Sequence, residues 1–318
     1  MMLGPRRARL NALAKINLGL QVLGRRPDGF HELRTIFHTI SLADTIEIEF
    51  TPGRGSAVSL ECSVPIPGEN LLERAARSVM DAARIRGEVR FRLTKAIPMG
   101  AGLGGGSSDA AAVLLALPVL AGRHLALARL IELGSALGSD VPFFLLGGAA
   151  VGVGRGTELY PLPDVPTRHA LVVAPGVHVS TAEAYEKLAR PELTSGAAMN
   201  TISSFESLAW MLSQDPAQTL PVVENDFETV VFRDFPKLGK IKRKLARQGA
   251  NPALMSGSGS SLFGLFESRA AAARARRSLE GAVFAVTLIS RARYHSMWWR
   301  RLATHIAGKT WPPQSRYA

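Results

Sequence analysis

The sequence predicts an α+β protein of two domains. Stretches with the alternation of a β-strand and stretches with helical periodicity follow one another in mixed order, rather than as a regular series of strand, helix and strand. A length of 318 residues suits two domains of ordinary size. Three prolines within residues 160–169 (YPLPDVPTRH) mark the boundary between them. We expect an N-terminal domain over residues 1–160, a C-terminal domain over 161–292 and an extension over 293–318.

The first half of the chain places strands on both sides of a helix, ahead of a glycine-rich loop. The strand signal is clear in DTIEIEF, where Ile46, Ile48 and Phe50 alternate with polar residues. The helix signal is a stripe of apolar residues in NLLERAARSVMDAAR. Strands are expected at residues 10–24, 44–50 and 89–95, helices at 70–84, 107–117 and 125–138, and a turn with a glycine-rich strand pair at 139–159.

The second half of the chain continues the mixed order of elements. Apolar runs such as ALVVAPG and VFAVTLI predict strands, and charged stretches with helical spacing such as KLGKIKRKLARQG predict helices. Strands are expected at residues 170–176, 261–266 and 283–289, and helices at 181–189, 237–249 and 268–281. The chain has no internal repeat, which excludes a solenoid or propeller.

Composition excludes several classes of protein. The longest apolar stretches are about 13 or 14 residues long and are broken by proline or glycine, short of the roughly 20 residues that span a bilayer. The basic start lacks the uninterrupted apolar run and cleavage site of a secretory signal. Because Cys62 is the single cysteine, no internal disulfide can form. We therefore expect a cytoplasmic protein without a transmembrane segment.

The net charge of +12 is concentrated near the C-terminus. Residues 290–318 carry six basic residues and no acid, whereas the rest of the chain has 32 basic and 26 acidic residues. A mild surplus of this kind suits an anionic small molecule and does not require nucleic acid. The same tail holds three of the four tryptophans, Trp298, Trp299 and Trp311. Three interpretations stay open for it: an element packed on the protein's own surface, an interfacial helix, or a nucleic-acid contact.

The loop PMGAGLGGGSSDAA, residues 98–111, has the composition of an anion-binding loop. It is not a P-loop, because no lysine lies between Gly100 and Ser108. The letters of GAGLGG fit a dinucleotide fingerprint, but that motif belongs in the first strand-to-helix turn and needs an acid about 20 residues later. A bare linker would not be followed directly by the helix-forming run AAAVLLAL. What remains is a set of glycine N–H groups at a helix N-terminus, which together bind phosphate.

Three motifs in order resemble the kinase superfamily of galactokinase, homoserine kinase, mevalonate kinase and phosphomevalonate kinase, the GHMP kinases. They are the glycine loop, the N-terminal AKINLGLQVLGRRPDGFHELRTIFHTISLADTIEIE and the late SGSGSSLFGLF. Within that superfamily, AKINL, RPDGFHEL and LAD resemble the family of 4-diphosphocytidyl-2-C-methyl-D-erythritol kinases, as do ENLLERAAR, LGSDVPFFL, PGVHVSTAEAY and ENDFE. The likeness covers residues 10–292.

The resemblance implies a fold, a reaction and its partners. The fold is the two-domain α+β GHMP kinase fold, with a ribosomal-protein-like N-terminal domain, a ferredoxin-like C-terminal α/β sandwich and the active site in the cleft between them. The reaction is transfer of phosphate from ATP, with Mg²⁺, to the 2-hydroxyl of 4-diphosphocytidyl-2-C-methyl-D-erythritol in the non-mevalonate pathway to isoprenoid precursors. The resemblance further implies no nucleic-acid partner and a monomer or weak homodimer.

The resemblance also assigns the chemistry to two residues outside the glycine loop. Asp140, in GSDVPFF, is implied to accept the proton of the substrate hydroxyl, and Lys15, in AKIN, to lie beside it and offset charge on the transferring group. From the residues alone, a turn aspartate capping a helix and a solvated lysine are the ordinary alternatives.

On the ATP side, the resemblance implies a binding set formed mainly by the loop. Asn70 and Lys95 match positions that line the nucleotide, although a helix cap and a surface charge are equal alternatives. Ser108, or Asp109 next to it, is a candidate contact for the metal ion, and no cluster of His and Cys ligands is present. The ATP set is Pro98, Met99, Gly100, Ala101, Gly102, Leu103, Gly104, Gly105, Gly106, Ser107, Ser108, Asn70 and Lys95.

On the acceptor side, the resemblance implies aromatic stacking on cytosine and polar contacts to the methylerythritol group. Composition alone would assign the aromatic residues to the core. The residue before His31 is usually tyrosine in the family and is Phe30 here, which keeps the stacking face but lacks the hydroxyl. The loop SGSGSS, 256–261, is expected to close over the phosphate cleft, although as an isolated motif it fits a hairpin turn equally well. The acceptor set is Asn17, Phe30, His31, Phe37, Thr181 and Tyr185.

Two rival functions are kept beside this one. A sister kinase with another small alcohol as acceptor, such as homoserine, mevalonate or a sugar, would share the glycine loop but not the RRPDGFHEL block. A basic nucleic-acid-binding protein would show affinity that falls steeply with salt, and no ATP turnover.

Overall fold

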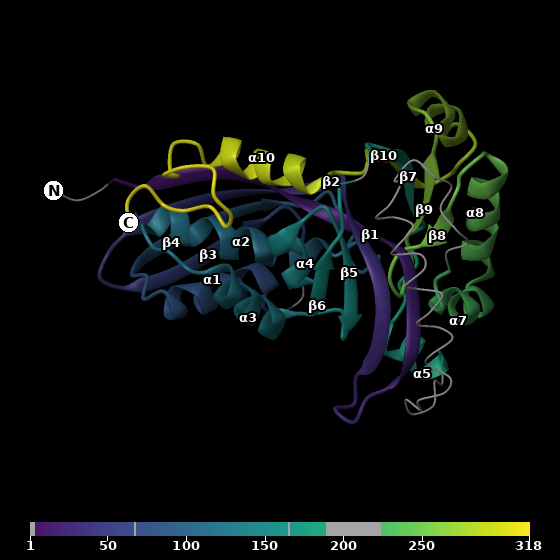
Figure 1. Ribbon diagram of the computed structural model, residues 1–318, viewed down its shortest axis with the longest axis horizontal. Helices are drawn as coiled ribbons and strands as arrows, with labels where there is room; N and C mark the ends of the chain where they lie inside the picture. Colours follow the sequence, from purple (N-terminus) through teal and green to yellow (C-terminus); the bar gives the residue numbers. More distant parts are fainter. Residues whose placement is uncertain (1–3, 67, 165, 189–223) are drawn as a thin grey trace.

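The computed structural model describes residues 4–66, 68–164, 166–188 and 224–318. Its strands form two sheets, one in each half of the chain, and the two halves lie side by side (Figure 1). The N-terminal half contains β1 (Arg6–Arg25), β2 (His31–Pro52), β3 (Ser56–Cys62), α1 (Leu71–Ala82), β4 (Gly87–Thr94), α2 (Gly105–Ala121), α3 (Leu127–Leu137), α4 (Val141–Leu146), β5 (Ala149–Gly154) and β6 (Glu158–Pro161). The remaining elements are β7 (His169–Ala174), α5 (Thr181–Leu188), α7 (Phe227–Asp234), α8 (Pro236–Arg247), β8 (Ala253–Met255), β9 (Leu262–Phe266), α9 (Arg269–Arg276), β10 (Ala282–Thr287) and α10 (Arg291–Arg301).

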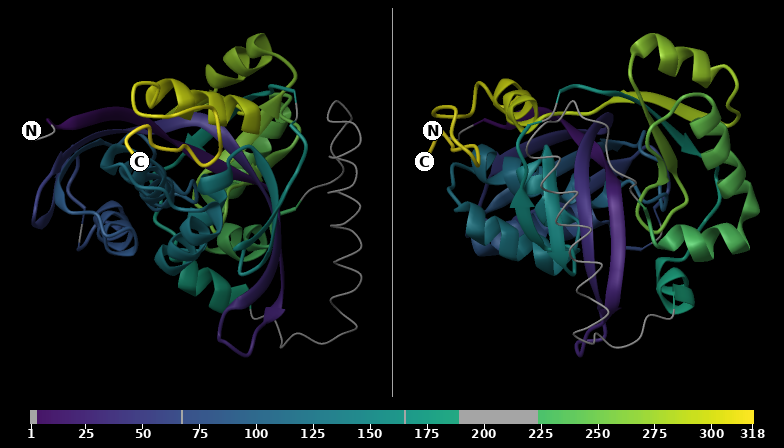
Figure 2. Two further views of the ribbon diagram at one scale, coloured as in Figure 1. Left: turned by 60° about the vertical axis from the view of Figure 1, so that its left-hand side comes forward. Right: turned by 45° about the vertical axis from the view of Figure 1, so that its right-hand side comes forward.

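The N-terminal sheet is built around the long strand β2. Strands β1 and β2 pair antiparallel from Arg6 opposite Phe50 to Arg25 opposite His31, with register shifts along β1. The opposite edge of β2 pairs with β5 and with β4, and β3 and β6 complete the sheet. Helices α1 and α2 cover one face of this sheet, α3 packs against α1, α2 and α4, and α2 is buried over most of its length. Figure 2 shows the β1–β2 hairpin running between the two halves of the molecule.

The C-terminal sheet has the order β10-β7-β9-β8 and is antiparallel throughout. One of its faces packs against β1 and β2, where an apolar layer joins Ile16, Ile36 and Ile40 to Val172 and Phe263. Its other face packs against α7, α8 and α9 through a second apolar layer. The apolar layer between the sheets fixes the position of β1 relative to the C-terminal half.

Most elements expected from the sequence lie where they were expected, but the first part of β2 was missed. Residues 35–40 of β2 are buried on both faces, because one face meets the N-terminal core and the other meets the C-terminal sheet. A strand buried on both faces loses the alternation of polar and apolar residues that signals a strand. Strands β3 and β8 and helices α4 and α7 were also missed; α4 spans only six residues, too few for helical periodicity to show.

The tryptophan-rich tail packs on the N-terminal half. Tyr294 and Trp298 on α10 are buried in the main apolar core. Trp311 stacks on His295 with 3.7 Å between ring centroids, and its Nε1 donates to the carbonyl of Leu145 at 2.9 Å. The interfacial interpretation needed exposed tryptophans, so packing on the protein's own surface is the interpretation that the geometry favours. Among the described residues, no helix combines the length and apolar character needed to cross a membrane.

Candidate active site

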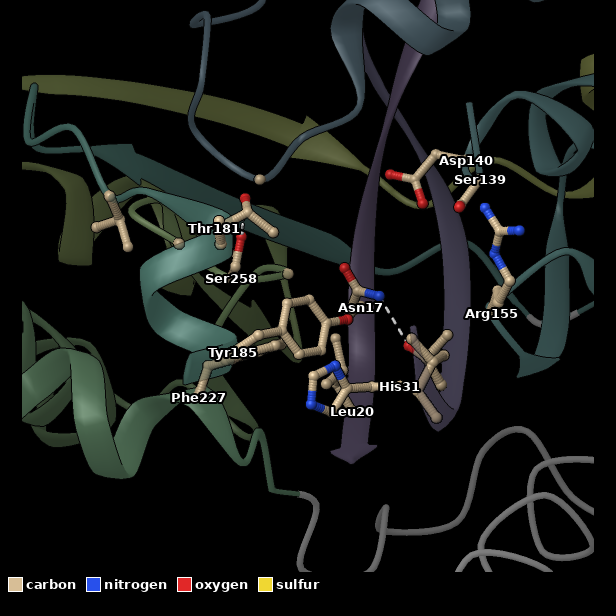
Figure 3. Close-up of a pocket in the computed structure, with 18 of the residues that line it drawn as sticks. Asn17, Leu20, His31, Ser139, Asp140, Arg155, Thr181, Tyr185, Phe227 and Ser258 are labelled. Carbon is tan, nitrogen blue, oxygen red and sulfur yellow. Dashed lines mark hydrogen bonds between the residues drawn. The ribbon is translucent and has the colours of Figure 1, made fainter. Parts of the chain in front are cut away.

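A cleft of about 1190 Å³ lies between the two halves of the molecule, lined by β1, the glycine loop, the start of α4, α5 and residues 257–259 (Figure 3). Both catalytic candidates and every residue of the acceptor set line it. Four residues of the expected ATP set do so as well: Gly100, Gly102, Gly104 and Ser107. The cleft therefore joins the glycine loop and the acceptor residues in one space.

The glycine loop connects β4 to α2 and presents unpaired N–H groups at the start of that helix. Helix α2 begins at Gly105, and its first intrahelical hydrogen bond runs from the N–H of Ser108 to the carbonyl of Gly104, at 2.9 Å. The preceding N–H groups have no partner inside the helix, and the helix dipole adds positive potential at this end. This end of α2 is therefore suited to bind a phosphate group.

Both halves of the molecule hold the glycine loop in place. The N–H of Lys15 donates to the carbonyl of Leu103 at 3.0 Å, and the N–H of Ser261 donates to the carbonyl of Ala101 at 3.1 Å. The hydroxyl of Ser256 donates to the carbonyl of Gly102 at 2.9 Å. Because three successive loop carbonyls are occupied in this way, the shape of the loop depends on the C-terminal half as well as on β1.

Lys15 and Asp140 meet in the cleft. The apolar neighbours of Lys15 on β1 pack toward the C-terminal sheet, so alternation turns the Lys15 and Asn17 side chains to the opposite face. Lys15 Nζ lies 3.4 Å from Asp140 Oδ2 and donates to Asn17 Oδ1 at 2.7 Å. Lys15 is 4% exposed in its side chain, whereas Asp140 is 32% exposed. The carboxylate is thus held beside a buried cation and still open to the cleft.

Local structure places these polar side chains. Asp140 directly precedes α4, and its side chain makes no capping hydrogen bond, so both oxygens stay available. Asn17 Nδ2 donates to Thr35 Oγ1 at 2.7 Å, which fixes the amide so that its oxygen faces Lys15. The ring of Phe37 lies 5.4 Å from Lys15 Nζ and provides a cation–π contact.

Aromatic rings form the opposite wall of the cleft. His31 stacks on Tyr185 with 4.6 Å between ring centroids, and Phe227 packs its edge against Tyr185 at 4.8 Å. Burial, and to a lesser extent the charge of Asp140, raises the pKa of Tyr185 to about 12, so its hydroxyl is a donor at neutral pH. At the start of α5, Thr181 Oγ1 and Ser258 Oγ share a hydrogen bond of 2.8 Å.

Several residues of the expected ATP set do not line this cleft. Asn70 caps α1, where its Oδ1 accepts from the N–H of Leu72 at 2.9 Å, and its Nδ2 is buried without a partner among the described residues. The hydroxyl of Ser108 is buried and donates to the carbonyl of Leu13 at 2.7 Å. The hydroxyl proton of Ser108 is therefore engaged by β1, and the expected contact of Ser108 with phosphate or a metal ion stays a prediction. The loop residues Pro98, Met99, Ala101, Leu103, Gly105 and Gly106 also fall outside the lining.

Lys95 and Asp109 also lie outside the lining of this cleft. Lys95 Nζ is buried between Asp109, at 2.8 Å, and Asp44 on β2. Asp44 also accepts from the N–H groups of Ala96 and Ile97, at 2.6 and 2.9 Å. Asp44 lies in the LAD motif but was not among the residues expected in the site. The ion pairs among these three charged groups hold the two ends of the glycine loop next to each other. The carboxylate of Asp109 is directed at Lys95.

The stability of this buried cluster depends on pH. Burial raises the pKa of Asp109 to about 7, an effect that Lys95 opposes and Asp44 strengthens. A carboxyl group whose pKa is raised by folding binds its proton more tightly in the folded state, and this tighter binding stabilises the folded protein. The stabilisation is complete at pH values below the unfolded-state pKa and is lost as pH rises through the folded-state pKa. Relative to Asp109→Asn, we expect the free energy of unfolding of the wild type to fall by about 1–3 kcal/mol from about pH 4 to pH 7.

Urea unfolding of the two proteins across this pH range measures the effect. Asp81→Asn serves as a control, because Asp81 is an exposed carboxylate on α1. If the free energy of unfolding changed with pH in parallel for wild type and Asp109→Asn, the raised pKa of Asp109 would be contradicted.

The described residues contain no cluster of three His, Cys, Asp or Glu side chains able to hold a metal ion.

Two domain families match the chain. Residues 70–148 match the GHMP kinases N terminal domain and residues 204–285 match the GHMP kinases C terminal domain. Over 316 residues, the chain is 58% identical to 4-diphosphocytidyl-2-C-methyl-D-erythritol kinase of Solibacter usitatus, with 98% of each chain covered. The chain belongs to the 4-diphosphocytidyl-2-C-methyl-D-erythritol kinase family of GHMP kinases. The kinase of the same name from Geobacter sulfurreducens is 43% identical, over 84% of this chain and 92% of its own.

Solved structures agree with membership of the 4-diphosphocytidyl-2-C-methyl-D-erythritol kinase family. A crystal structure of 4-(cytidine 5'-diphospho)-2C-methyl-D-erythritol kinase is 40% identical, with a TM-score of 0.70 over 88% of this chain and 98% of that one. Homoserine kinase from Cytophaga hutchinsonii, at 19% identity and a TM-score of 0.63, shares the fold alone. The family and the α+β two-domain GHMP kinase fold predicted from the motifs are thereby confirmed.

Within the 4-diphosphocytidyl-2-C-methyl-D-erythritol kinase family, the tail of this chain is shared with at least one relative. The match to the S. usitatus kinase covers 98% of this chain of 318 residues, so it includes α10. The match to the G. sulfurreducens kinase is shorter, at 269 residues.

Proposed function

We propose that this chain transfers the γ-phosphoryl group of ATP to the 2-hydroxyl of 4-diphosphocytidyl-2-C-methyl-D-erythritol, which gives the 2-phosphate and ADP. The observation that carries the proposal is the juxtaposition of Lys15, Asp140 and Asn17 with the helix N-terminus of the glycine loop in one cleft. The names of the relatives at 58% and 43% identity support the same acceptor. The reaction is a step in the non-mevalonate formation of isoprenoid precursors.

Asp140 orients the acceptor hydroxyl and takes its proton. Phosphoryl transfer has a loose transition state, so the protein acts mainly by positioning groups and stabilising charge. The carboxylate of Asp140 is open to the cleft and has no capping role in α4, so it is free to accept a hydrogen bond from the hydroxyl. As the oxygen of the acceptor bonds to phosphorus, its proton passes to Asp140 and ADP leaves with the electron pair of the broken bond.

Lys15 stabilises the charge that moves between donor and acceptor. Its ammonium group is buried next to Asp140 and is held by Asn17 and by the ring of Phe37. A buried, fixed cation interacts more strongly with the phosphoryl oxygens than one in water does, and it needs no rearrangement during the reaction. The N–H groups at the start of α2 hold the phosphates of ATP on the other side of the cleft.

The aromatic wall of the cleft suits the cytosine ring of the acceptor. His31 and Tyr185 offer stacking faces. Phe30, a residue that is 48% exposed, offers a third ring. Stacking needs only a ring, so phenylalanine at position 30 in place of the usual tyrosine keeps this contact. Asn17 and Thr181 are placed to contact the methylerythritol group. The donor is ATP as its Mg²⁺ complex, in which the ion neutralises charge on the phosphate oxygens, and we place the enzyme in the cytoplasm.

An acceptor panel tests the proposed function. We expect ADP release from ATP with 4-diphosphocytidyl-2-C-methyl-D-erythritol, and none above background with homoserine, mevalonate or galactose. Phosphorus NMR of the product checks that the new phosphate is on the 2-hydroxyl. Turnover of another alcohol without turnover of the cytidyl compound would contradict the proposal and favour a sister kinase.

A further inference from the structure

Arg155 is a cation of the cleft that the reaction proposed above leaves without a role. It lies in the turn between β5 and β6, and its side chain lines the same cleft as Lys15 and Asp140. Figure 3 draws it on the same side as Ser139 and Asp140, with its guanidinium group directed toward Ser139. Within the part of the chain that the structure describes, no carboxylate lies within ion-pair distance of Arg155; Asp28 senses its charge from further away, and the Nε of Arg155 is buried without a hydrogen-bond partner.

The turn that carries Arg155 is fixed by its neighbours. Gly154 and Gly156 flank it with φ of 65° and 84°, and the N–H of Gly156 donates to the carbonyl of Val153 at 2.9 Å. The N–H of Gly154 donates to Glu32 Oε1 on β2 at 3.1 Å. The other oxygen of Glu32 pairs with Arg26. The negative charge of the carboxylate that anchors the turn is therefore balanced by Arg26 and not by Arg155.

Phe30 orients the guanidinium group without using its hydrogen-bond donors. The carbon at the centre of the guanidinium lies 3.4 Å from the centroid of the Phe30 ring. Stacking uses the face of the group, whereas its N–H donors lie in the plane and point outward. Arg155 therefore presents a rigid, charged edge of the kind that binds phosphate oxygens through two hydrogen bonds.

The acceptor of the proposed reaction brings a matching anion. Its diphosphate links the cytidine end, which we place against His31 and Tyr185, to the methylerythritol end, which we place near Asn17. The cation nearest the reacting end, Lys15, is paired with Asp140 and serves the transferring group. We propose that Arg155 binds the diphosphate of the acceptor, an assignment that rests on the function proposed above.

A comparison of cytidine 5'-diphosphate with cytidine isolates this contact. By calorimetry, Arg155→Gln should weaken binding of the diphosphate by roughly 10- to 100-fold and leave binding of cytidine unchanged, because only the charged ligand loses hydrogen bonds. In turnover, the KM for 4-diphosphocytidyl-2-C-methyl-D-erythritol should rise by a similar factor while the KM for ATP stays constant. Arg155→Lys should recover part of the affinity, since it restores the charge but not the paired hydrogen bonds.

The controls separate this contact from other causes. Arg277→Gln removes the same charge from an exposed position on the C-terminal side of α9, and we expect wild-type behaviour from it. Equal loss of cytidine and cytidine diphosphate binding in Arg155→Gln would overturn the proposal, as would a rise confined to the KM for ATP. Loss of diphosphate binding in Arg25→Gln but not in Arg155→Gln would overturn it in favour of the other arginine of the cleft. An inactive wild type that still binds cytidine diphosphate through Arg155 would contradict the proposed function, not this assignment.

Discussion

Asp140→Asn should lower kcat by about 10²- to 10⁴-fold, the range that loss of a proton-transfer group produces. The substitution keeps the shape of the side chain but removes the proton acceptor and the negative charge 3.4 Å from Lys15. The groups that would hold the phosphates of ATP lie on the glycine loop, so the affinity for ATP should change little. Rapid-quench measurement of ADP formation, together with calorimetric titration of ATP, gives both quantities on the same protein.

Glu186→Gln is the matched control for this experiment. Glu186 is another carboxylate that lines the cleft, and it lies on α5, exposed and away from the Lys15 pair. We expect near wild-type turnover from this variant. If both variants lost activity to the same degree, general electrostatics of the cleft would explain the loss, and Asp140 would not be the proton acceptor. If Asp140→Asn lost ATP binding together with turnover, Asp140 would have a structural role.

The acceptor side of the site was predictable from the sequence because each of its residues lies in a motif. Lys15 and Asp140 are 125 positions apart, and nothing in their spacing brings them together; only the resemblance to a family with a known order of motifs does. The structure brings them within 3.4 Å, and His31 and Tyr185 into a stack. The stack joins the first residue of β2 to a residue on α5, so it connects the two halves of the molecule.

Part of the expected ATP set lies outside the lining of the cleft, and burial explains why the sequence did not indicate this for Lys95. A lysine after a strand, as in TKAIP, resembles an exposed surface charge, and an aspartate in the first turn of a helix resembles a partner of the helix dipole. Sequence carries no sign that Lys95 and Asp109 are buried around Asp44, which comes from β2 and is distant in the chain. Arg155 was missed likewise, because an arginine between two glycines has the composition of an ordinary turn.

Gly102→Ala should raise the KM for ATP strongly and destabilise the protein, because Gly102 is where the glycine loop touches the C-terminal half. A Cβ atom at this position would lie 2.1 Å from the carbonyl oxygen of Ser256, and the residue has a φ of +75°. The hydroxyl of Ser256 also donates to the carbonyl of Gly102, so relief of the clash moves the loop away from its partner. We expect the free energy of unfolding to fall by about 1–3 kcal/mol. Thermal unfolding and steady-state kinetics with varied ATP measure the two effects.

Gly106→Ala provides the comparison for stability. A Cβ atom there would meet nothing within 4 Å, and the residue lies in the first turn of α2, where alanine is favoured over glycine by roughly 0.5–1 kcal/mol. It should therefore unfold at the same temperature as the wild type or higher. A Gly102→Ala protein with wild-type stability and a wild-type KM for ATP would mean that the loop and the Ser256 segment are not in close contact. It would equally contradict the arrangement of the two halves around the loop, in which the carbonyls on either side of Gly102, those of Leu103 and Ala101, accept from Lys15 and Ser261.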